Sequence, residues 1–211
     1  MNIWMLILVV SPIPIVAMVG DWDDDVLLCW GIGMAFLAAG IEVGVDKAFN
    51  DAGLPLNLGA KALLLYGLVE ESLKYFAITT ARYPLPQGRR LVGVAVACAV
   101  GFASTENFFY VSGFSKVIHG RDLEVASMAR IFLPFVFHLV NAPLLVCGHI
   151  VERFKPIAGV ALATLLHWFY DFFLSAQNEA GVKAGYVVIV VGFLLSAATF
   201  RKASALQRGA K

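Results

Sequence analysis

The sequence contains few charged residues and few cysteines. Only 15% of its 211 residues are charged, and the formal net charge is +1. No basic run alternates with aromatic residues, and no glycine-rich phosphate loop is present, so we expect neither nucleic acid nor nucleotide as a partner. The three cysteines stand singly in apolar stretches without CxxC spacing, so we infer neither a disulfide framework nor a thiolate metal site. Hydrophobic residues, by contrast, make up 60% of the chain.

Apolar runs long enough to cross a membrane recur along the whole chain, with short polar connectors between them. A helix rises about 1.5 Å per residue, so about 20 apolar residues span a bilayer. We therefore predict an all-α, polytopic transmembrane helix bundle that forms a single integral membrane domain over residues 1–211. About seven spans are expected, at residues 2–20, 26–45, 57–80, 91–113, 125–151, 157–176 and 185–200.

Basic residues gather in alternate connectors. The connectors 81–90 and 152–156 and the tail 201–211 together hold more Lys and Arg than the connectors on the other side. Because the side richer in Lys and Arg normally stays in the cytoplasm, the distribution predicts a cytoplasmic C-terminus.

Two adjacent carboxylates and a lysine lie in the middle of the third span. A charged side chain at mid-membrane costs roughly 2.5 to 3.5 kcal/mol, so Glu70, Glu71 and Lys74 need a reason to be there. On a helix Lys74 can neutralise either carboxylate, but not both. The other carboxylate must find a second partner, take up a proton or face water, which are also the requirements of a general base. A purely structural ion pair is the alternative.

Three more central spans bring polar side chains to a similar depth, so the four central helices are predicted to form a catalytic core. His167 and Asp171 are four residues apart, and the carboxylate can therefore orient the imidazole from the next turn. Taken singly, His138 fits a core histidine, and Glu106 fits a buried partner for Arg130 or Lys74. The polar residues of these three spans are Glu106, Asn107, Arg130, His138, Asn141, His167 and Asp171.

Carboxylates and histidines in this combination support hydrolysis in two ways. In the first, Glu70 or Glu71 is the general base on a water molecule, and a histidine or Asn107 donates to the developing oxyanion. In the second, His138 and His167 hold a zinc ion together with a glutamate, either Glu71 or Glu106, and another glutamate is the base. Neither route needs a covalent nucleophile.

The same residues resemble the motifs of a known family. Residues 70–74 (EESLK) resemble the EExxK motif of the PrsW intramembrane proteases, and residues 102–107 (FASTEN) resemble their second motif. His138 and the turn from His167 to Asp171 are similar to the third and fourth. The related CAAX prenyl endopeptidase and Abi superfamily (CPBP) has histidine where this chain has Glu106, and asparagine where it has Asp171. The second difference leaves open whether Asp171 supports His167 or helps to bind the oxyanion.

The resemblance covers residues 57–175 and implies a helical membrane protease of the glutamate or metalloprotease type. It places Glu70, Glu71, Glu106, His138 and His167 in the site. It also implies a membrane-embedded protein or peptide as substrate, such as an anti-sigma factor, and a prokaryotic plasma membrane as the location.

Two other functions are compatible with polar residues inside a membrane. A proton- or ion-coupled transporter uses the same side chains, although its usual repeat of interrupted helices is absent from the sequence. A non-catalytic scaffold would use them to bind a partner helix.

Overall fold

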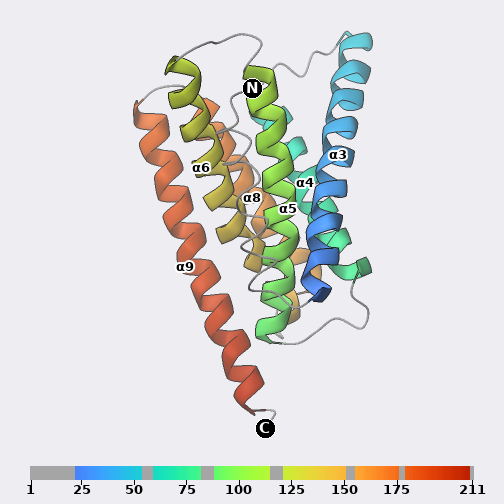
Figure 1. Ribbon diagram of the computed structural model, residues 1–211, viewed down its shortest axis with the longest axis vertical. Coiled ribbons are helices and arrows are strands. Elements are labelled where there is room, and N and C mark those ends of the chain that lie inside the picture. The colour runs from blue at the N-terminus through green and yellow to red at the C-terminus, as the bar shows by residue number, and fades with distance from the viewer. Residues whose placement is uncertain are drawn as a thin grey trace.

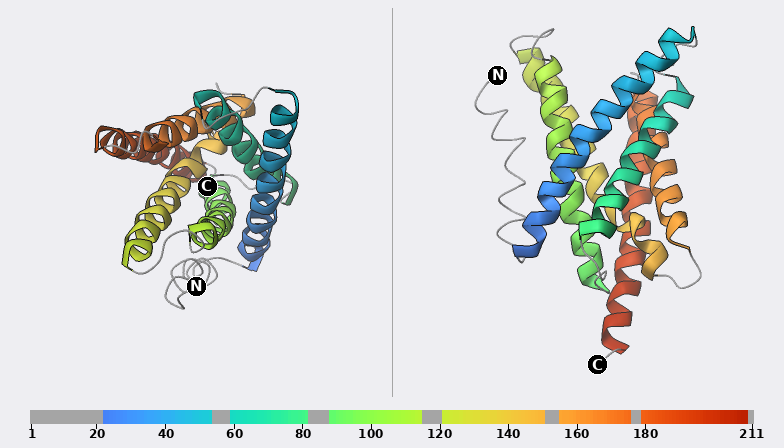
Figure 2. Two further views of the ribbon diagram at one scale, coloured as in Figure 1. Left: turned by 90° about the horizontal axis from the view of Figure 1, so that it is seen from above. Right: turned by 90° about the vertical axis from the view of Figure 1, so that its right-hand side faces the viewer.

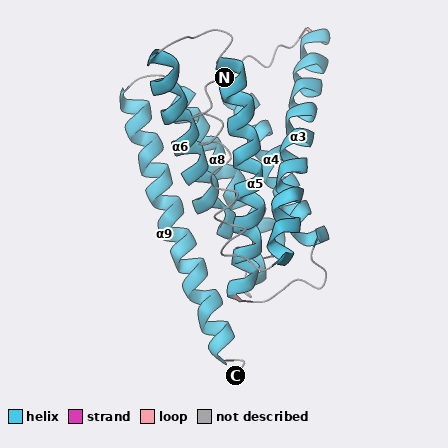
Figure 3. Ribbon diagram, in the orientation of Figure 1, coloured by secondary structure: helices cyan, strands magenta, loops and turns pink. Residues whose placement is uncertain are grey.

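The computed structural model describes residues 22–53, 59–81, 88–114, 121–150, 155–175 and 179–209. Every element within these ranges is a helix, which confirms the all-α class (Figure 3). The first predicted span, at residues 2–20, lies outside the described residues. The helices, labelled as in Figure 1, are α3 (Trp22–Asp51), α4 (Ala60–Ala81), α5 (Arg89–Phe114), α6 (Arg121–Leu145), α7 (Cys147–Ile150), α8 (Pro156–Ser175) and α9 (Glu179–Gly209).

Each remaining predicted span corresponds to a helix, although most of these helices extend beyond the apolar run. The largest difference is at α9, which covers residues 179–209 where the hydropathy pattern predicts 185–200. Polar residues can continue a helix outside the apolar region, and hydropathy does not register them. Five helical segments in the described part of the chain are long and apolar enough to cross a membrane. Helix α4 is not among these five, and its sequence contains Glu70, Glu71 and two lysines.

The predicted span at 125–151 is interrupted near its end. Helix α6 stops at Leu145, Val146 forms a turn, and the short helix α7 follows. The turn brings Gly148 against the start of α8, where a Cβ atom on Gly148 would lie 2.6 Å from the Lys155 carbonyl oxygen and 2.7 Å from the Cα atom of Pro156. A straight helix with an ordinary side chain at Gly148 would not fit this contact.

The six long helices form a ring. Around it, α3 packs on α5, α5 on α6, α6 on α9, α9 on α8, α8 on α4, and α4 on α3 (Figure 2). Contacts between α6 and α8 and between α4 and α5 close its centre. Helix α5 is the most enclosed, with 78% of its apolar segment buried, whereas the corresponding value for α9 is 28%. The helices with central polar residues therefore meet inside the bundle, and α9 turns most of its surface outward.

Two glycines allow the backbones of α3 and α5 to come into direct contact. A Cβ atom on Gly31 would collide with the carbonyl oxygen of Cys98, and a Cβ atom on Gly101 would collide with the carbonyl oxygen of Leu28. Small residues at a helix crossing permit this kind of close contact in membranes. The position of α5, which carries Glu106, is therefore set by direct contact with the α3 backbone.

Side-chain hydrogen bonds to backbone carbonyl groups connect other helices of the ring. The indole Nε1 of Trp168 donates to the carbonyl oxygen of Ala60 at 2.7 Å, which joins α8 to the first turn of α4. The amide Nδ2 of Asn141 donates to the carbonyl oxygen of Ala163 at 3.1 Å, which joins α6 to α8. These bonds hold α4, α6 and α8 around a common centre.

Candidate active site

Two carboxylates and one ammonium group of α4 face the interior of the bundle. Glu71 and Lys74 are 1% exposed, and Glu70 is 8% exposed. The Nζ atom of Lys74 lies 2.7 Å from Oε1 of Glu71 and 3.6 Å from Oε2 of Glu70. Among the described residues, Oε2 of Glu70 is a buried oxygen with no hydrogen-bond partner. Lys74 therefore neutralises Glu71 first, and Glu70 retains an unoccupied oxygen.

The imidazole of His138 connects α4, α5 and α6. Its Nδ1 atom lies 2.9 Å from Nζ of Lys74, and its Nε2 atom lies 2.6 Å from Oε2 of Glu106. The Glu106 side chain is 18% exposed, whereas that of His138 is 2% exposed. His138 is thus held between a buried ammonium group and a carboxylate nearer the surface.

The imidazole of His167 connects α8 to the same centre. Its Nδ1 atom lies 2.7 Å from Oε1 of Glu71, and its Nε2 atom lies 3.3 Å from Oδ2 of Asp171. The Nε2 atom is also 3.8 Å from Oε2 of Glu70. Asp171 therefore contacts His167 from the next turn of α8, as the four-residue spacing predicted.

Four of these side chains form a buried polar cluster that has the composition of a metal site. Glu70, Glu71, His138 and His167 are buried, and each offers a ligand atom within 4.8 Å of the others. Both imidazoles face a carboxylate through Nε2, Glu106 for His138 and Asp171 for His167, and direct Nδ1 toward the group. Such an outer carboxylate is the usual partner of a metal-bound histidine. Two histidines and a glutamate are also a known donor set of catalytic zinc.

Comparison with known proteins connects this arrangement to a protease family. Residues 26–198 match the family model described as "PrsW family intramembrane metalloprotease". This chain belongs to the PrsW family. Protease PrsW of Shouchella clausii (strain KSM-K16) is 32% identical over 174 residues, covering 76% of this chain and 75% of the relative. Protease PrsW of Halalkalibacterium halodurans is 26% identical over 163 residues, covering 72% and 69%. No solved structure matches the chain.

Membership of the PrsW family makes the protein an intramembrane protease, as the motif resemblance implied. Its apolar helices make it an integral, multi-pass membrane protein. The matched region begins in α3 and ends in α9, so it is longer than the segment 57–175 to which the resemblance was assigned. The role of each residue in the cluster stays a prediction.

Three further residues predicted from the sequence, Asn107, Asn141 and Arg130, lie on α5 and α6 of this PrsW-family chain. Asn107 is buried on α5, one position after Glu106. Asn141 is buried on α6, and its amide group binds the backbone of α8. Arg130 belongs to α6, but its side chain lies outside the described part of the chain. The predicted pairing of Arg130 with Glu106 therefore stays a prediction.

Aromatic rings that the sequence analysis did not select pack against the cluster. The Phe102 ring centroid lies 4.3 Å from Nζ of Lys74. The Phe137 ring lies 5.7 Å from that of His138 and 5.1 Å from that of His167, and it stacks on Tyr170 at 4.3 Å. These rings restrict the orientation of both imidazoles. Position in the sequence was the available signal, because Phe102 opens the FASTEN segment and Phe137 precedes His138.

Glu42 is a further carboxylate near the cluster, and the sequence analysis left it out. It lies on α3, within electrostatic range of Glu70, Glu106 and His167, and its Oε1 atom is a buried oxygen without a hydrogen-bond partner among the described residues. A carboxylate inside a glycine- and alanine-rich apolar span was the signal that could have found it. Asp46, one turn further along α3, accepts a hydrogen bond from the Tyr66 hydroxyl of α4.

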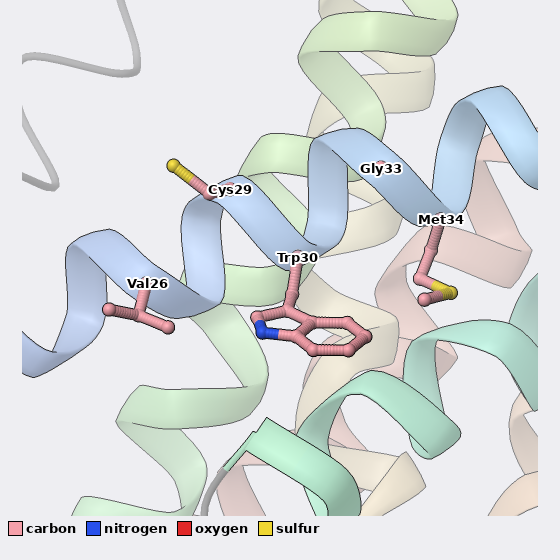
Figure 4. A pocket seen from close by; sticks show the side chains of 5 residues that line it. All are labelled: Val26, Cys29, Trp30, Gly33 and Met34. Carbon is pink, nitrogen blue, oxygen red and sulfur yellow. The ribbon is translucent and has the colours of Figure 1, made fainter.

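An apolar pocket of about 550 Å³ lies along the first half of α3. Trp30 and Met34 point to the same side of the helix, and Cys29 points away from them (Figure 4). None of the cluster residues lines this pocket. The predicted site residues and this pocket therefore lie in different parts of the bundle.

Proposed function

We propose that this protein is a zinc-dependent intramembrane endopeptidase that hydrolyses a peptide bond of a membrane-embedded protein. The proposal rests on one observation above all: Glu70, Glu71, His138 and His167 come from three helices, are buried, and bring four ligand atoms within 4.8 Å of one another. Isolated charges at this depth are expensive, so a group of this kind needs a function that uses it. The core of the activity is assigned to residues 57–175 within a single membrane domain.

His138, His167 and Glu71 are the residues proposed to hold the metal. When bound, zinc lowers the pKa of a coordinated water molecule and polarises the substrate carbonyl group. Glu106 and Asp171 position the two imidazoles from outside, through the Nε2 contacts at 2.6 Å and 3.3 Å.

Glu70 is the proposed general base. Its Oε2 atom is buried and has no hydrogen-bond partner among the described residues, whereas Oε1 of Glu71 already contacts Lys74 and His167. A carboxylate oxygen without a competing donor can accept a proton from the attacking water and pass it to the leaving amine. Asn107 is the predicted donor to the substrate oxyanion.

The proposed substrate is a transmembrane or membrane-associated protein, with an anti-sigma-factor-like protein as one example of this class. The curated relatives are bacterial proteins, which supports a prokaryotic plasma membrane as the location. The proposed cytoplasmic C-terminus rests on the excess of Lys and Arg in the connectors 81–90 and 152–156 and in the tail 201–211.

Zinc content and cleavage should be lost together when His138 is replaced by alanine. We expect about one zinc ion per chain in the purified parent protein and cleavage of a fluorescent transmembrane peptide in liposomes. His149→Ala is the matched control, because His149 contacts Tyr75 at 2.9 Å and lies outside the cluster. Full cleavage by folded His138→Ala would overturn the proposed function. Cleavage by a metal-free parent protein would show that zinc is not needed. A glutamate would then be the sole activator of water.

Asp171→Asn should weaken zinc binding roughly tenfold to a hundredfold, because the substitution removes the negative charge that holds Nε2 of His167. Asp51→Asn, an exposed residue at the end of α3, is the control. Zinc titration by calorimetry measures the effect. An unchanged dissociation constant in Asp171→Asn would show that Asp171 does not position the imidazole for metal binding.

A further inference from the structure

The ammonium group of Lys74 lies among the donor atoms assigned to the metal. It is 2.7 Å from Oε1 of Glu71, 2.9 Å from Nδ1 of His138 and 3.6 Å from Oε2 of Glu70. All three contacted residues belong to the four-residue group. A side chain that only neutralised Glu71 would not also need to contact His138 and approach Glu70.

The burial of Lys74 is unusual for a lysine. Its residue exposure is 1%, and its Nζ atom lies 4.3 Å from the Phe102 ring centroid. Lysine normally keeps its ammonium group in water and buries only the carbon chain. Removing the charge from water is costly unless strong partners surround it. The other described lysine side chains are all exposed, namely those of Lys47, Lys61, Lys155, Lys183 and Lys202.

We propose, on the basis of the proposed function, that Lys74 is an intramolecular competitor of the metal. The ammonium group and a zinc ion are both cations, and both need the lone pairs of Oε1 of Glu71 and Nδ1 of His138. Metal binding must therefore move the ammonium group away from these two atoms.

This competition has two consequences. Lys74 keeps the buried carboxylates and imidazoles together when the metal is absent, because it supplies the positive charge that they require. It also lowers the affinity for the metal, since the contacts of the metal-free site must first be broken. A lysine that merely positions Glu71 would have the opposite effect, because its removal would disorder a ligand and weaken metal binding. The sign of the change in affinity separates the two roles.

The test is a zinc titration by calorimetry of chelator-treated full-length protein in detergent, in the parent protein and in Lys74→Met and Lys74→Gln. We expect zinc to bind roughly tenfold or more tightly in both variants, because a cation is removed from the site. Lys74→Arg retains the charge and should bind no more tightly than the parent. Lys183→Met removes an exposed lysine that pairs with Glu179 at 2.6 Å, and it should leave the dissociation constant unchanged.

The outcomes distinguish this inference from the function on which it rests. Equal or weaker zinc binding in Lys74→Met and Lys74→Gln, with a parent that binds zinc, would overturn the competition and leave the metal site intact. No zinc binding in any of the proteins would overturn the metal site itself.

If the neutral variants do not fold, the parent protein still provides the test through the ¹⁵N signal of the Lys74 Nζ atom, assigned by its loss in Lys74→Arg. Zinc should shift this signal as the ammonium group moves. An unchanged signal at saturating zinc would overturn the competition.

Discussion

Replacing Glu70 with glutamine is expected to lower kcat for a transmembrane test peptide by about 10²- to 10⁴-fold, the usual contribution of a general base. The substitution preserves the shape of the side chain and removes its ability to accept a proton from water. Because zinc is assigned to His138, His167 and Glu71, the metal content should remain that of the parent. Single-turnover cleavage and elemental analysis of the same preparation measure both quantities.

The control for this prediction is Glu179→Gln. The Glu179 side chain is 83% exposed and pairs with Lys183, so its replacement should change neither kcat nor zinc content. A Glu70→Gln protein with the parent kcat would show that another group accepts the proton. Loss of zinc from Glu70→Gln would instead place Glu70 among the ligands, and the base would then have to be another residue, such as Glu106.

Gly101→Ala should destabilise the protein by about 3 kcal/mol, although the change adds only one methyl group. The added carbon would collide with the carbonyl oxygen of Leu28, so α3 and α5 would have to separate. Glu106 lies five residues further along α5, and its contact with His138 should weaken as well. Detergent-based unfolding monitored by circular dichroism, together with cleavage, measures both effects.

Gly93→Ala on the same helix provides a matched comparison. A Cβ atom at Gly93 would have no neighbouring atom within 4 Å. Alanine is favoured over glycine in a helix, so Gly93→Ala should be neutral or stabilising by up to about 1 kcal/mol. Equal stabilities for the two variants would show that the close approach of α3 and α5 does not hold the bundle together.

The helical class and the contact between the central polar residues could be predicted from two quantities, the rise per residue of a helix and the position of each residue within its span. Span length follows from the helical rise, and equal depth follows from counting residues along each span. Side chains at equal depth on neighbouring helices then meet, as Glu71, His138 and His167 do. The family match confirmed the motif resemblance. The span lengths and the equal depth needed only distances along the chain, whereas the family was inferred from the likeness of the motifs to those of PrsW proteases.

Rotation and local packing could not be predicted in the same way. The sequence did not decide between Glu70 and Glu71, because the choice depends on how α4 is rotated against α8. The contact between Lys74 and His138 is a tertiary contact across 64 residues, and helical spacing contains no information about it. The turn at Val146 was missed because hydropathy continues through it, whereas the close backbone contact of Gly148 with the start of α8 is visible only in the folded bundle.

The residues of the buried polar cluster come from distant parts of the chain, so the cluster can form only late in biosynthesis. Glu71 and His167 are 96 residues apart, so their contact can form only after α8 has been synthesised and inserted. A nascent chain that has inserted α4, α5 and α6 holds His138 and the α4 carboxylates but lacks the second imidazole. A partly inserted protease should therefore be inactive, and cleavage should begin only once α8 has joined the bundle.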